Sequence, residues 1–479
     1  MGSKPAIMTM KTNPLVERRN FLKGLLAAGA IAPGSFPFIA RGAESSANGK
    51  VNLACIGIGN RGAEIIRAFR STRLANIVAL CDVDMGAKQT QPILNEFPDV
   101  PRFQDFRVMF DKMGKEIDAV CVGTPDFSHF PICMLAMSLG KHVYVEKPMA
   151  HSFKQVDLMM AAEKKYNVAC QMGNQGHSEA NYFQFKAWTE AGVISEVTRI
   201  TAFMNGQRRW HGKTFTDFLP AEPVPDTMDW DLWTATAREH PFNHGYHNGE
   251  WRSWYDYGNG ALGDWGAHII DTAHRFLKLG MPTVVDPVHT AGHSRFVFPQ
   301  ESTLVFKFPA RDGMPACELT WLDGQKNLPE LPENFGEGVV DPNIPPPSTG
   351  NLQTKVNPPG KVIYGGNLTF KGGSHGSTLT ILDSEMARDM VSVVPDWPES
   401  PSNHFKNFLL ACKGEEKCRS SFDIAGPLCQ AMELGIIAQQ VNARLEFDPV
   451  TRRITNHKVA DALLDGPPPR EGWEQYYKM

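Results

Sequence analysis

Several classes of protein are excluded by what this sequence lacks. Its 48 lysines and arginines form no basic run, and 52 acidic residues leave a formal net charge of −4, so nothing favours a nucleic-acid partner. There are nine cysteines, an odd number, and none has a C-x-x-C spacing. Cys55, Cys81 and Cys121 lie inside apolar runs, which indicates buried thiols and not a disulfide framework.

Long hydrophobic runs are also scarce. Beyond the N-terminal region no apolar stretch has the ~20 residues of a transmembrane helix, so we expect no stable membrane insertion after leader removal. In residues 1–47, Arg18 and Arg19 precede Phe-Leu-Lys and a small-residue apolar stretch, which resembles a bacterial twin-arginine export signal. An ordinary amphipathic helix is the alternative. We expect a leader here, and therefore a periplasmic or otherwise exported protein.

Strand and helix patterns alternate from residue 48 to residue 173. Five apolar runs have the composition of strands buried on both faces: Val51–Gly57, Asn76–Asp82, Ile117–Gly123, His142–Val145 and Val168–Met172. Helical periodicity separates them, for example at Gly62–Arg70, Pro131–Leu139 and Ser152–Lys165. This alternation is typical of the α/β class and predicts a parallel, doubly wound sheet, which is a Rossmann dinucleotide-binding domain over 48–173.

The composition changes after the last of these runs. Residues 174–400 contain alternating patterns such as Val197–Met204 and Ser302–Phe308 and most of the tryptophans, which predicts an α+β domain with a large, open, mostly antiparallel sheet. Residues 323–360 are rich in Pro, Gly and Asn, and we interpret them as a long surface loop. Residues 401–479 are predicted to form C-terminal helices and a tail.

A glycine-rich string, Gly57-Ile58-Gly59-Asn60-Arg61-Gly62, ends the first predicted strand and opens a predicted helix. Gly57 allows the tight turn, Gly59 lets the backbone approach a pyrophosphate, and Gly62 allows close packing of helix on strand. Asp82 ends the next strand, where an acid binds the ribose hydroxyls and repels a 2′-phosphate; Asp84 is a weaker candidate. The pattern predicts NAD over NADP, and a turn without a ligand is the alternative.

Two further strings follow predicted strands at the edge where open α/β sheets bind ligands. We expect His129, which comes after Gly123-Thr124-Pro125-Asp126, either to contact the cofactor or to cap the next helix. In Glu146-Lys147-Pro148 the lysine can donate a hydrogen bond to a substrate hydroxyl, and a cis proline can hold it in place. The residues placed at the cofactor are therefore Thr124, Pro125, His129, Glu146 and Lys147.

A third string covers residues 258–271. Asp264 and His268 are four residues apart, so they share one face of a helix, and Asp271 lies one turn further on. This arrangement suits a general base with a carboxylate nearby. A structural helix with a solvated acid and a buried histidine is the alternative.

The glycine-rich string, Glu146-Lys147-Pro148 and Asp264-Trp265-Gly266-Ala267-His268 together resemble the glucose–fructose oxidoreductase/inositol dehydrogenase/rhizopine-catabolism (Gfo/Idh/MocA) superfamily. The resemblance runs from about Lys50 to Val441 and includes details of an exported bacterial branch. It implies that Lys147 binds and polarises the reacting hydroxyl, that His268 is the general base, and that Asp264 orients the substrate or the histidine. It also implies that the late helices pack back beside the nucleotide domain, and that the protein is a dimer or tetramer.

Polar and aromatic residues near these strings are candidates for binding a sugar. Asn174, Gln175 and His177 can face the cofactor crevice, although a turn that satisfies its own backbone explains each equally well. Trp254 and Tyr255 can stack on a pyranose ring, in an aromatic region that we expect to be mostly packing. We expect no metal, although three histidines of this region have spacings that one could use: His240, His244 and His247.

The leading hypothesis is an NAD-dependent oxidoreductase that acts on a CH–OH group of a sugar, polyol or glycoside. An exported enzyme has no obvious NAD pool, so we expect the cofactor to be tightly bound. The alternative is a redox-neutral NAD-dependent glycoside hydrolase, which needs one more acid or base, with Tyr246, Tyr255 and His177 as candidates. A catalytically silent sugar-binding protein is a third hypothesis.

Overall fold

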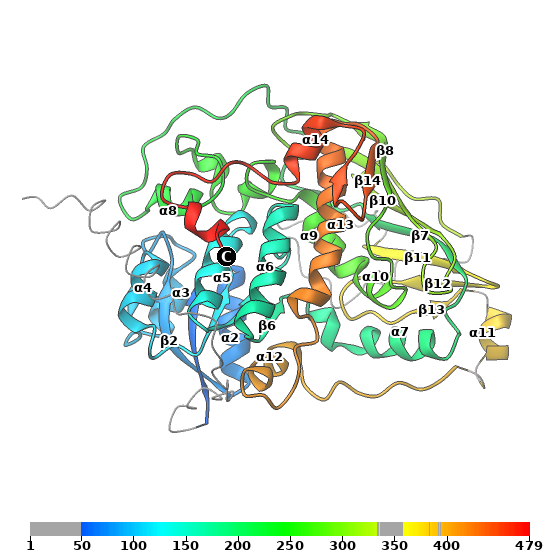
Figure 1. Ribbon diagram of the computed structural model, residues 1–479, viewed down its shortest axis with the longest axis horizontal. Coiled ribbons are helices and arrows are strands. Elements are labelled where there is room, and N and C mark those ends of the chain that lie inside the picture. Colours follow the sequence, from blue (N-terminus) through cyan, green and yellow to red (C-terminus); the bar gives the residue numbers. More distant parts are fainter. Residues whose placement is uncertain (1–48, 333–334, 336–357, 383, 391, 393) are drawn as a thin grey trace, which may run out of the picture. The chain divides into compact units, whose positions relative to one another are not determined.

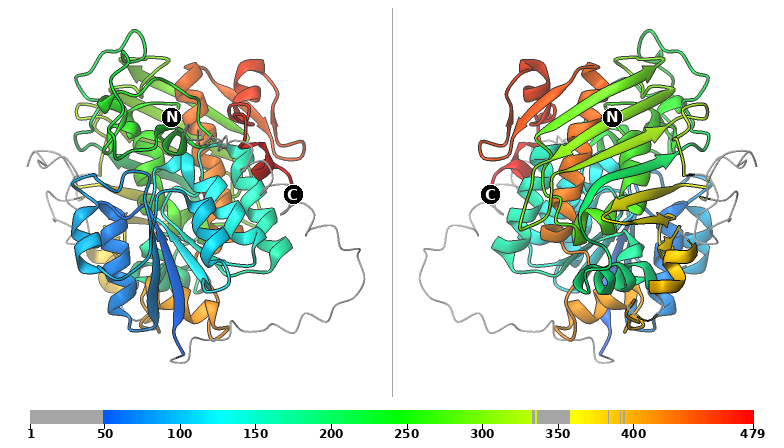
Figure 2. Two further views of the ribbon diagram at one scale, coloured as in Figure 1. Left: turned by 90° about the vertical axis from the view of Figure 1, so that its left-hand side faces the viewer. Right: turned by 90° about the vertical axis from the view of Figure 1, so that its right-hand side faces the viewer.

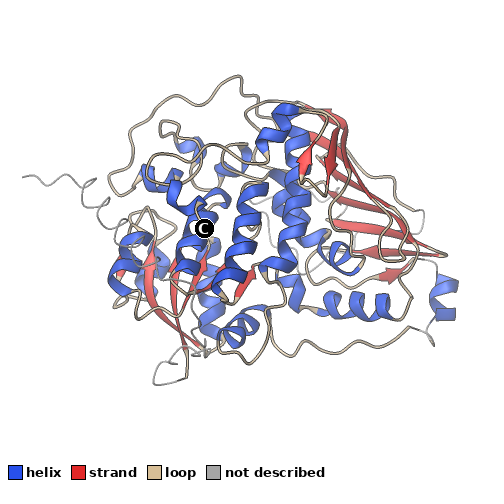
Figure 3. Cartoon of the chain, viewed as in Figure 1, coloured by secondary structure: helices blue, strands red, loops and turns tan. Residues whose placement is uncertain are grey.

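The computed structural model describes residues 49–332, 335, 358–382, 384–390, 392 and 394–479. The predicted leader and most of the predicted loop at 323–360 lie outside the described residues. The described chain forms two sheets, with the helices α6, α9 and α13 between them (Figure 1; Figure 3).

The first sheet is the predicted Rossmann sheet. Its six strands are all parallel and lie in the order β3-β2-β1-β4-β5-β6. The strands are β1 (Val51–Ile56), β2 (Ala75–Cys81), β3 (Arg102–Phe103), β4 (Ala119–Val122), β5 (His142–Val145) and β6 (Cys170–Met172). The helices are α2 (Arg61–Ser71), α3 (Gln91–Glu96), α4 (Phe106–Met113), α5 (His129–Ser138) and α6 (Phe153–Tyr166). The five predicted strands are all present, because each is a continuous apolar run that is buried in the sheet.

The second sheet has nine strands in the order β13-β12-β11-β7-β10-β9-β8-β14-β15. Only β7 and β10 pair in parallel among its described strands, so the prediction of a mostly antiparallel sheet is confirmed. The strands are β7 (Val197–Met204), β8 (Val284–Ala291), β9 (Glu301–Phe308), β10 (Cys317–Asp323), β11 (Gly360–Gly365), β12 (Leu368–Gly372), β13 (Thr380–Ile381), β14 (Leu445–Asp448) and β15 (Arg453–Ile454).

Five further helices lie in the second part of the described chain. They are α7 (Ala180–Glu190), α8 (Trp230–Thr234), α9 (Gly260–Ile269), α10 (Asp271–Phe276) and α11 (Ser384–Met390). Along β9 every second residue is buried, so one face of the sheet packs on helices while the other stays partly open. Helix α9 packs against β7 and β10 and against α13.

The C-terminal part of the chain returns to the nucleotide domain (Figure 2). Helix α12 (His404–Cys412) packs on α2, while α13 (Phe422–Val441) contacts α6 on one side and α9 and β8 on the other. After α14 (Lys458–Leu463), the rings of Trp473 and Tyr476 pack against Phe106 of α4. The C-terminal helices and the tail therefore connect the nucleotide domain with the second domain.

The cysteines fit the sequence prediction. All nine cysteines are free, and eight of them are buried, as their apolar runs predict. None of the described helices combines the length and the apolar character needed to cross a membrane.

Candidate active site

A cleft of about 1170 Å³ opens at the edge of the Rossmann sheet where its strands end. The glycine-rich loop between β1 and α2 and the segments after β2, β4 and β5 form one part of its wall. Much of the remaining wall comes from the second domain: residues 207–210 and 247–252, Trp233, Asp264, Trp265, His268 and His375. Segments far apart in the sequence thus share one cavity.

The glycine-rich loop needs its glycines for packing. Gly57 has a φ of +77°, and a Cβ there would lie 2.7 Å from the backbone nitrogen of Thr124. A Cβ on Gly62 would lie 1.8 Å from the carbonyl oxygen of Gly57, so only glycine allows α2 to start this close to the strand. Gly59, Asn60 and Arg61 line the cleft at the start of α2, where the helix N-terminus favours an anion.

Asp82, at the end of β2, lines the same part of the cleft. Its Oδ2 accepts a hydrogen bond from the backbone nitrogen of Ile58 at 2.9 Å, and its Oδ1 accepts one from that of Asp84 at 3.1 Å. Burial raises the pKa of Asp82 to about 6, while these bonds oppose the rise. Asp84 lies outside the cleft wall and binds Thr227. The glycine-rich loop, the start of α2 and the Asp82 carboxylate therefore provide the groups that an NAD site requires.

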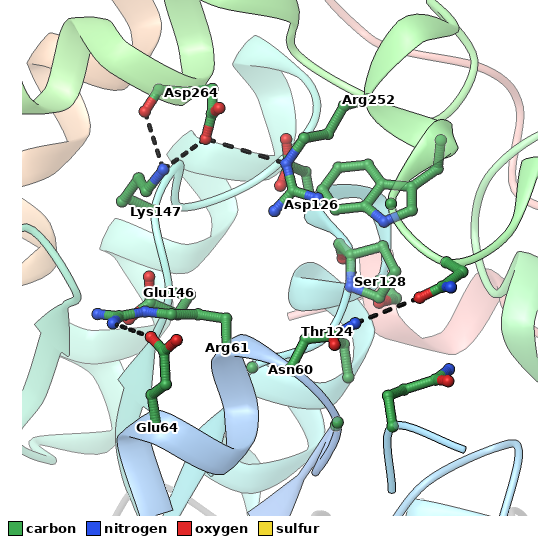
Figure 4. A pocket seen from close by; sticks show the side chains of 18 of the residues that line it. Asn60, Arg61, Glu64, Thr124, Asp126, Ser128, Glu146, Lys147, Arg252 and Asp264 are labelled. Carbon is green, nitrogen blue, oxygen red and sulfur yellow. Dashed lines mark hydrogen bonds and ion pairs between the residues drawn. The ribbon is translucent and has the colours of Figure 1, made fainter. Parts of the chain in front are cut away.

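Thr124 and Pro125 also line the cleft, as does Glu146. Arg61 Nη2 lies 3.3 Å from Glu146 Oε1, and Arg61 Nη1 lies 2.9 Å from Glu64 Oε2 (Figure 4). The guanidinium of Arg61 is thus already paired with two carboxylates.

Lys147 and Asp264 meet across the domain boundary. Lys147 Nζ donates to Asp264 Oδ1 at 2.6 Å and to the Asp264 carbonyl oxygen at 2.8 Å (Figure 4). Arg252 Nε lies 4.0 Å from the same carboxylate oxygen. Burial opposes ionisation of Asp264, but the charges of Lys147, Arg252 and Arg208 hold its pKa well below the ordinary value. The Lys147–Pro148 peptide is cis, as the sequence analysis allowed.

His268 lies one turn after Asp264 on α9 and stacks on His375, with ring centroids 3.8 Å apart and planes at 16°. The backbone nitrogen of His375 donates to the carbonyl oxygen of His268 at 2.9 Å, which fixes the two segments together. Burial, followed by the charges of His375 and Lys147, lowers the pKa of His268 well below its ordinary value. His268 is therefore a neutral imidazole at pH 7.

Several residues of the cleft, among them His375, were not predicted from the sequence. His375 lies between β12 and β13, about a hundred residues from His268, and its position in a glycine-rich turn is no signal of chemistry. Arg208, Arg252 and Asp126 also line the cleft. Burial raises the pKa of Asp126 to about 7. Asp126 follows Thr124 and Pro125 just after a predicted strand, and this position is itself a signal for a residue at the ligand-binding edge.

His129 is not among the residues that line the cleft, so the structure does not support its expected contact with the cofactor. Its side chain is fully buried at the start of α5, one residue after the N-cap Ser128. Its ring nitrogens lie 2.9 Å from the carbonyl oxygens of Pro148 and Thr124. Burial lowers its pKa to about 4. The histidine therefore holds two cleft-forming segments together from behind.

Two of the three polar candidates after β6 also lie outside the cleft. Asn174 Nδ2 donates to Asp271 Oδ2 at 3.0 Å, and His177 Nε2 lies 2.8 Å from Asp271 Oδ1. All three are buried, and Asp271 begins a new helix, α10, in place of a further turn of α9. The prediction that Asn174 and His177 bind substrate is therefore corrected, because Asp271 satisfies them. Gln175 does line the cleft.

Trp254 and Tyr255 are packing residues and not a sugar platform. The indole of Trp254 is buried and donates to the carbonyl oxygen of Gly245 at 3.2 Å, and Tyr255 packs on Phe298 with ring centroids 4.2 Å apart. Tyr246 is buried as well, and its hydroxyl accepts from the backbone nitrogen of Leu219. The tryptophans that do line the cleft are Trp210, Trp233, Trp251 and Trp265.

The three histidines considered for a metal are dispersed. His240 pairs with Asp256 at 2.7 Å and His244 pairs with Glu222 at 2.7 Å, while His247 lines the cleft. In the described part of the chain, no three or more His, Cys, Asp or Glu side chains gather as a metal site would require.

Comparisons with known proteins agree with this architecture. A family model described as "Oxidoreductase family, NAD-binding Rossmann fold" matches residues 51–174, and "Oxidoreductase family, C-terminal alpha/beta domain" matches residues 187–287. The structure of the WlbA dehydrogenase from Chromobacterium violaceum, in complex with NADH and UDP-GlcNAcA, has a TM-score of 0.56 at 12% identity, covering 85% of this chain and 98% of that one. At this identity the likeness concerns the fold.

Two curated relatives differ in their named activities. Glycosyl hydrolase family 109 protein 2 of Shewanella sp. (strain ANA-3) is 30% identical over 220 residues, which cover 41% of this chain and 48% of that protein. Inositol 2-dehydrogenase/D-chiro-inositol 3-dehydrogenase of Lactiplantibacillus plantarum is 26% identical over 187 residues, covering 38% and 51%. The chain thus matches about half the length of these relatives. The two family models thus match the NAD-binding domain and the C-terminal alpha/beta domain of the Gfo/Idh/MocA oxidoreductases over residues 51–174 and 187–287.

Proposed function

We propose that this protein is an NAD-dependent oxidoreductase that acts on a CH–OH group of a sugar, polyol or glycoside. The observation that carries the proposal is the ion pair of Lys147 and Asp264 in one cleft with His268 and the glycine-rich loop. The pair joins the nucleotide domain to the second domain at the end of β5, where ligands of open α/β sheets bind.

The residues that would hold NAD are those of the cofactor part of the cleft. The loop Gly57–Gly62 and the start of α2 would receive the pyrophosphate, and Asp82 would bind the ribose. Thr124, Pro125 and Glu146 would border the nicotinamide end. NAD, when bound, accepts the hydride that leaves the substrate carbon.

The remaining chemistry belongs to side chains of this chain. Lys147, held in place by Asp264, donates a hydrogen bond to the oxygen of the reacting hydroxyl. His268 accepts the proton of that hydroxyl at a ring nitrogen, since burial keeps its imidazole neutral. His375, stacked on it, holds the ring in position.

A redox-neutral glycoside hydrolase is the second candidate, and the glycosyl hydrolase relatives favour it. In that reaction a ring hydroxyl is oxidised transiently, the leaving group is eliminated, water adds, and reduction restores the sugar. It needs a further acid, and the buried positions of His177, Tyr246 and Tyr255 argue against all three. Asp126 lines the cleft, and since burial raises its pKa to about 7 it can supply that proton.

Three wider parts of the proposal rest on the sequence. We propose export by the twin-arginine route because of Arg18, Arg19 and the apolar stretch after them. Export would separate the enzyme from soluble NAD, which favours a tightly bound cofactor. A dimer or tetramer follows by analogy with the superfamily.

The experiment is to denature the purified protein, identify any released cofactor by mass spectrometry, and then test native protein with free sugars and aryl glycosides. Bound NAD that becomes NADH with a free sugar supports the dehydrogenase. Bound NAD with aryl-glycoside cleavage and no net reduction supports the hydrolase. No NAD, and no uptake of added NAD, contradicts both and leaves a silent sugar-binding protein.

A further inference from the structure

Three arginines of the second domain line the cleft on the side of Lys147. They are Arg208 and Arg209, which follow β7, and Arg252, which precedes α9. None of them belongs to a glycine-rich loop or to the residues assigned above to the cofactor. Their charges affect one another: Arg208 and Arg209 each interact electrostatically with Arg252 and with Asp264.

We propose that the substrate carries an oxyanion, namely a carboxylate, phosphate or sulfate attached to the sugar, and that Arg208 and Arg252 bind this group beside Lys147. The inference rests on the proposed function and adds the substrate class to it.

Arg208 gives the main evidence. Its Nη1 donates only to the carbonyl oxygen of Gln207, at 3.1 Å, and its Nε and Nη2 are shielded from solvent without a hydrogen-bond partner among the described residues. The guanidinium lies 5.0 Å from the centre of the Trp265 ring, next to Asp264 in sequence. Burial, opposed by Asp264 and Asp323, lowers the pKa of Arg208 to about 10, so it is still charged at pH 7. A shielded guanidinium with unused donors suits an anion.

Arg209 and Arg252 are held in fixed positions around it. Arg209 Nη1 lies 3.4 Å from Glu250 Oε1, and its guanidinium packs so closely on Gly249 that a Cβ there would lie 2.9 Å from Arg209 Cζ. Arg252 lies over the ring of Trp251, 4.1 Å from its centre. Positions fixed in advance reduce the entropy lost when an anion binds.

The acids of this region are already engaged. Asp264 binds Lys147 at 2.6 Å, and Glu250 is shared between Arg209 and Lys213, whose Nζ lies 2.5 Å from it. Asp126, which lines the same cleft, ionises only partly at pH 7 because burial raises its pKa to about 7. The arginine side of the cleft therefore keeps a positive excess.

The phosphates of NAD do not account for this excess. Their place is at the glycine-rich loop and the start of α2, where backbone donors bind phosphate. The cation of that region, Arg61, already pairs with Glu64 and Glu146. The arginines lie instead around Asp264, and so around the group that holds Lys147.

The test measures binding to the purified full chain by isothermal titration calorimetry. The probes are glucuronate, galacturonate, glucose 6-phosphate and N-acetylglucosamine 6-sulfate, each compared with its neutral parent sugar. We expect at least one acidic sugar to bind roughly tenfold or more tightly than its parent, as hydrogen bonds to a charged group would give. The acidic sugar that binds most tightly identifies which oxyanion the arginines bind: carboxylate, phosphate or sulfate. Equal binding of every pair, or no binding by any acidic sugar, overturns the inference.

Variants then assign the preference to Arg208. Arg208→Gln should lose roughly 10- to 100-fold in affinity for the acidic sugar and little for the neutral one, while Arg208→Lys should keep part of the preference. Arg199→Gln, on β7 and outside the cleft wall, is the matched control and should change neither. If Arg208→Gln weakens NAD binding and spares the sugar preference, the anion is the cofactor and the inference is wrong.

The same measurements separate this inference from the proposed function. Preference for acidic sugars without NADH formation or glycoside cleavage supports the inference and contradicts the function. Turnover of neutral sugars without any preference for acidic sugars supports the proposed function and contradicts the inference. Thermal unfolding of Arg208→Gln, with Arg208→Lys beside it, identifies a variant that fails to fold.

Discussion

The two parts of the cleft differ in the groups that form their walls. The cofactor part consists largely of backbone: a glycine-rich turn, a helix start and one carboxylate at a strand end. The opposite part consists of charged side chains, Lys147, Asp264, Arg208 and Arg252, brought together from two domains. A backbone site depends on local geometry, and a side-chain site depends on tertiary packing. The two should therefore respond differently to substitution.

The largest effect is expected on the side-chain part. Lys147→Ala should lower kcat roughly 10³-fold, because the hydroxyl oxygen loses its donor and Asp264 loses its closest counter-ion. NAD binding, measured by titration of cofactor-free protein, should change little. Lys154→Ala, an exposed lysine on α6, is the control. A variant that loses NAD binding along with activity would show that the two parts are not separate.

The backbone part can be tested with two glycines. Gly62→Ala should destabilise the protein by about 1–3 kcal/mol even without NAD, because its Cβ would overlap the carbonyl oxygen of Gly57. A Cβ on Gly59 would come too close only to the flexible side chain of Gln89, so Gly59→Ala should keep the stability and weaken NAD binding. Thermal unfolding of cofactor-free protein checks the first and NAD titration the second. Equal destabilisation by both would contradict this division of roles.

A smaller effect is expected at the histidine pair. His375→Gln removes one of the charges that lower the pKa of His268, the larger cause being burial. The pKa of His268 should rise, and because the base acts in its neutral form, the acidic limb of kcat/KM should shift to higher pH. We expect kcat at pH 7 to fall about tenfold. His211→Gln, at a histidine outside the cleft wall, should leave the profile in place.

The smallest effect concerns Glu433 on α13, which binds Asn259 Nδ2 at 2.6 Å behind the cleft. Burial, and then the charge of Asp126, raise its pKa to about 8. The folded state thus holds a proton that the unfolded chain releases above pH 4.5, so stability falls as the pH rises from 4.5 to 8. Glu433→Gln should flatten this fall and raise Tm at pH 8 by about 2 °C. Parallel pH curves for the two proteins would exclude this origin.

The backbone part of the cleft could be predicted almost completely from the sequence. The glycine-rich string is contiguous, and each strand of the Rossmann sheet is a continuous apolar run, so local patterns were enough. The two-residue β3 and the short helices α3 and α4 were missed because their patterns are too short to distinguish. Lys147, Asp264 and His268 were found through short motifs joined by a family resemblance. Their shared cleft follows from the fold.

The errors on the side-chain part have two causes. A polar side chain near a site can be satisfied by a partner that the sequence does not reveal, and Asp271 is such a partner for Asn174 and His177. Helical spacing placed Asp271 with Asp264, but α9 ends at Ile269 and a new helix begins. Arg208 and His375 were missed for the converse reason. Nothing beside them in the sequence marks chemistry, and only tertiary packing brings them to the cleft.

Helix α13 has a consequence for motion. It is buried along most of its length, and it packs on α6 of the nucleotide domain and on α9 and β8 of the second domain. A hinge that swung one domain from the other would have to expose one of these apolar faces to water, at about 25 cal/mol per Å². Exchange of substrate should therefore depend on local fluctuations of the loops around the cleft, and α13 should be among the slowest segments in hydrogen exchange.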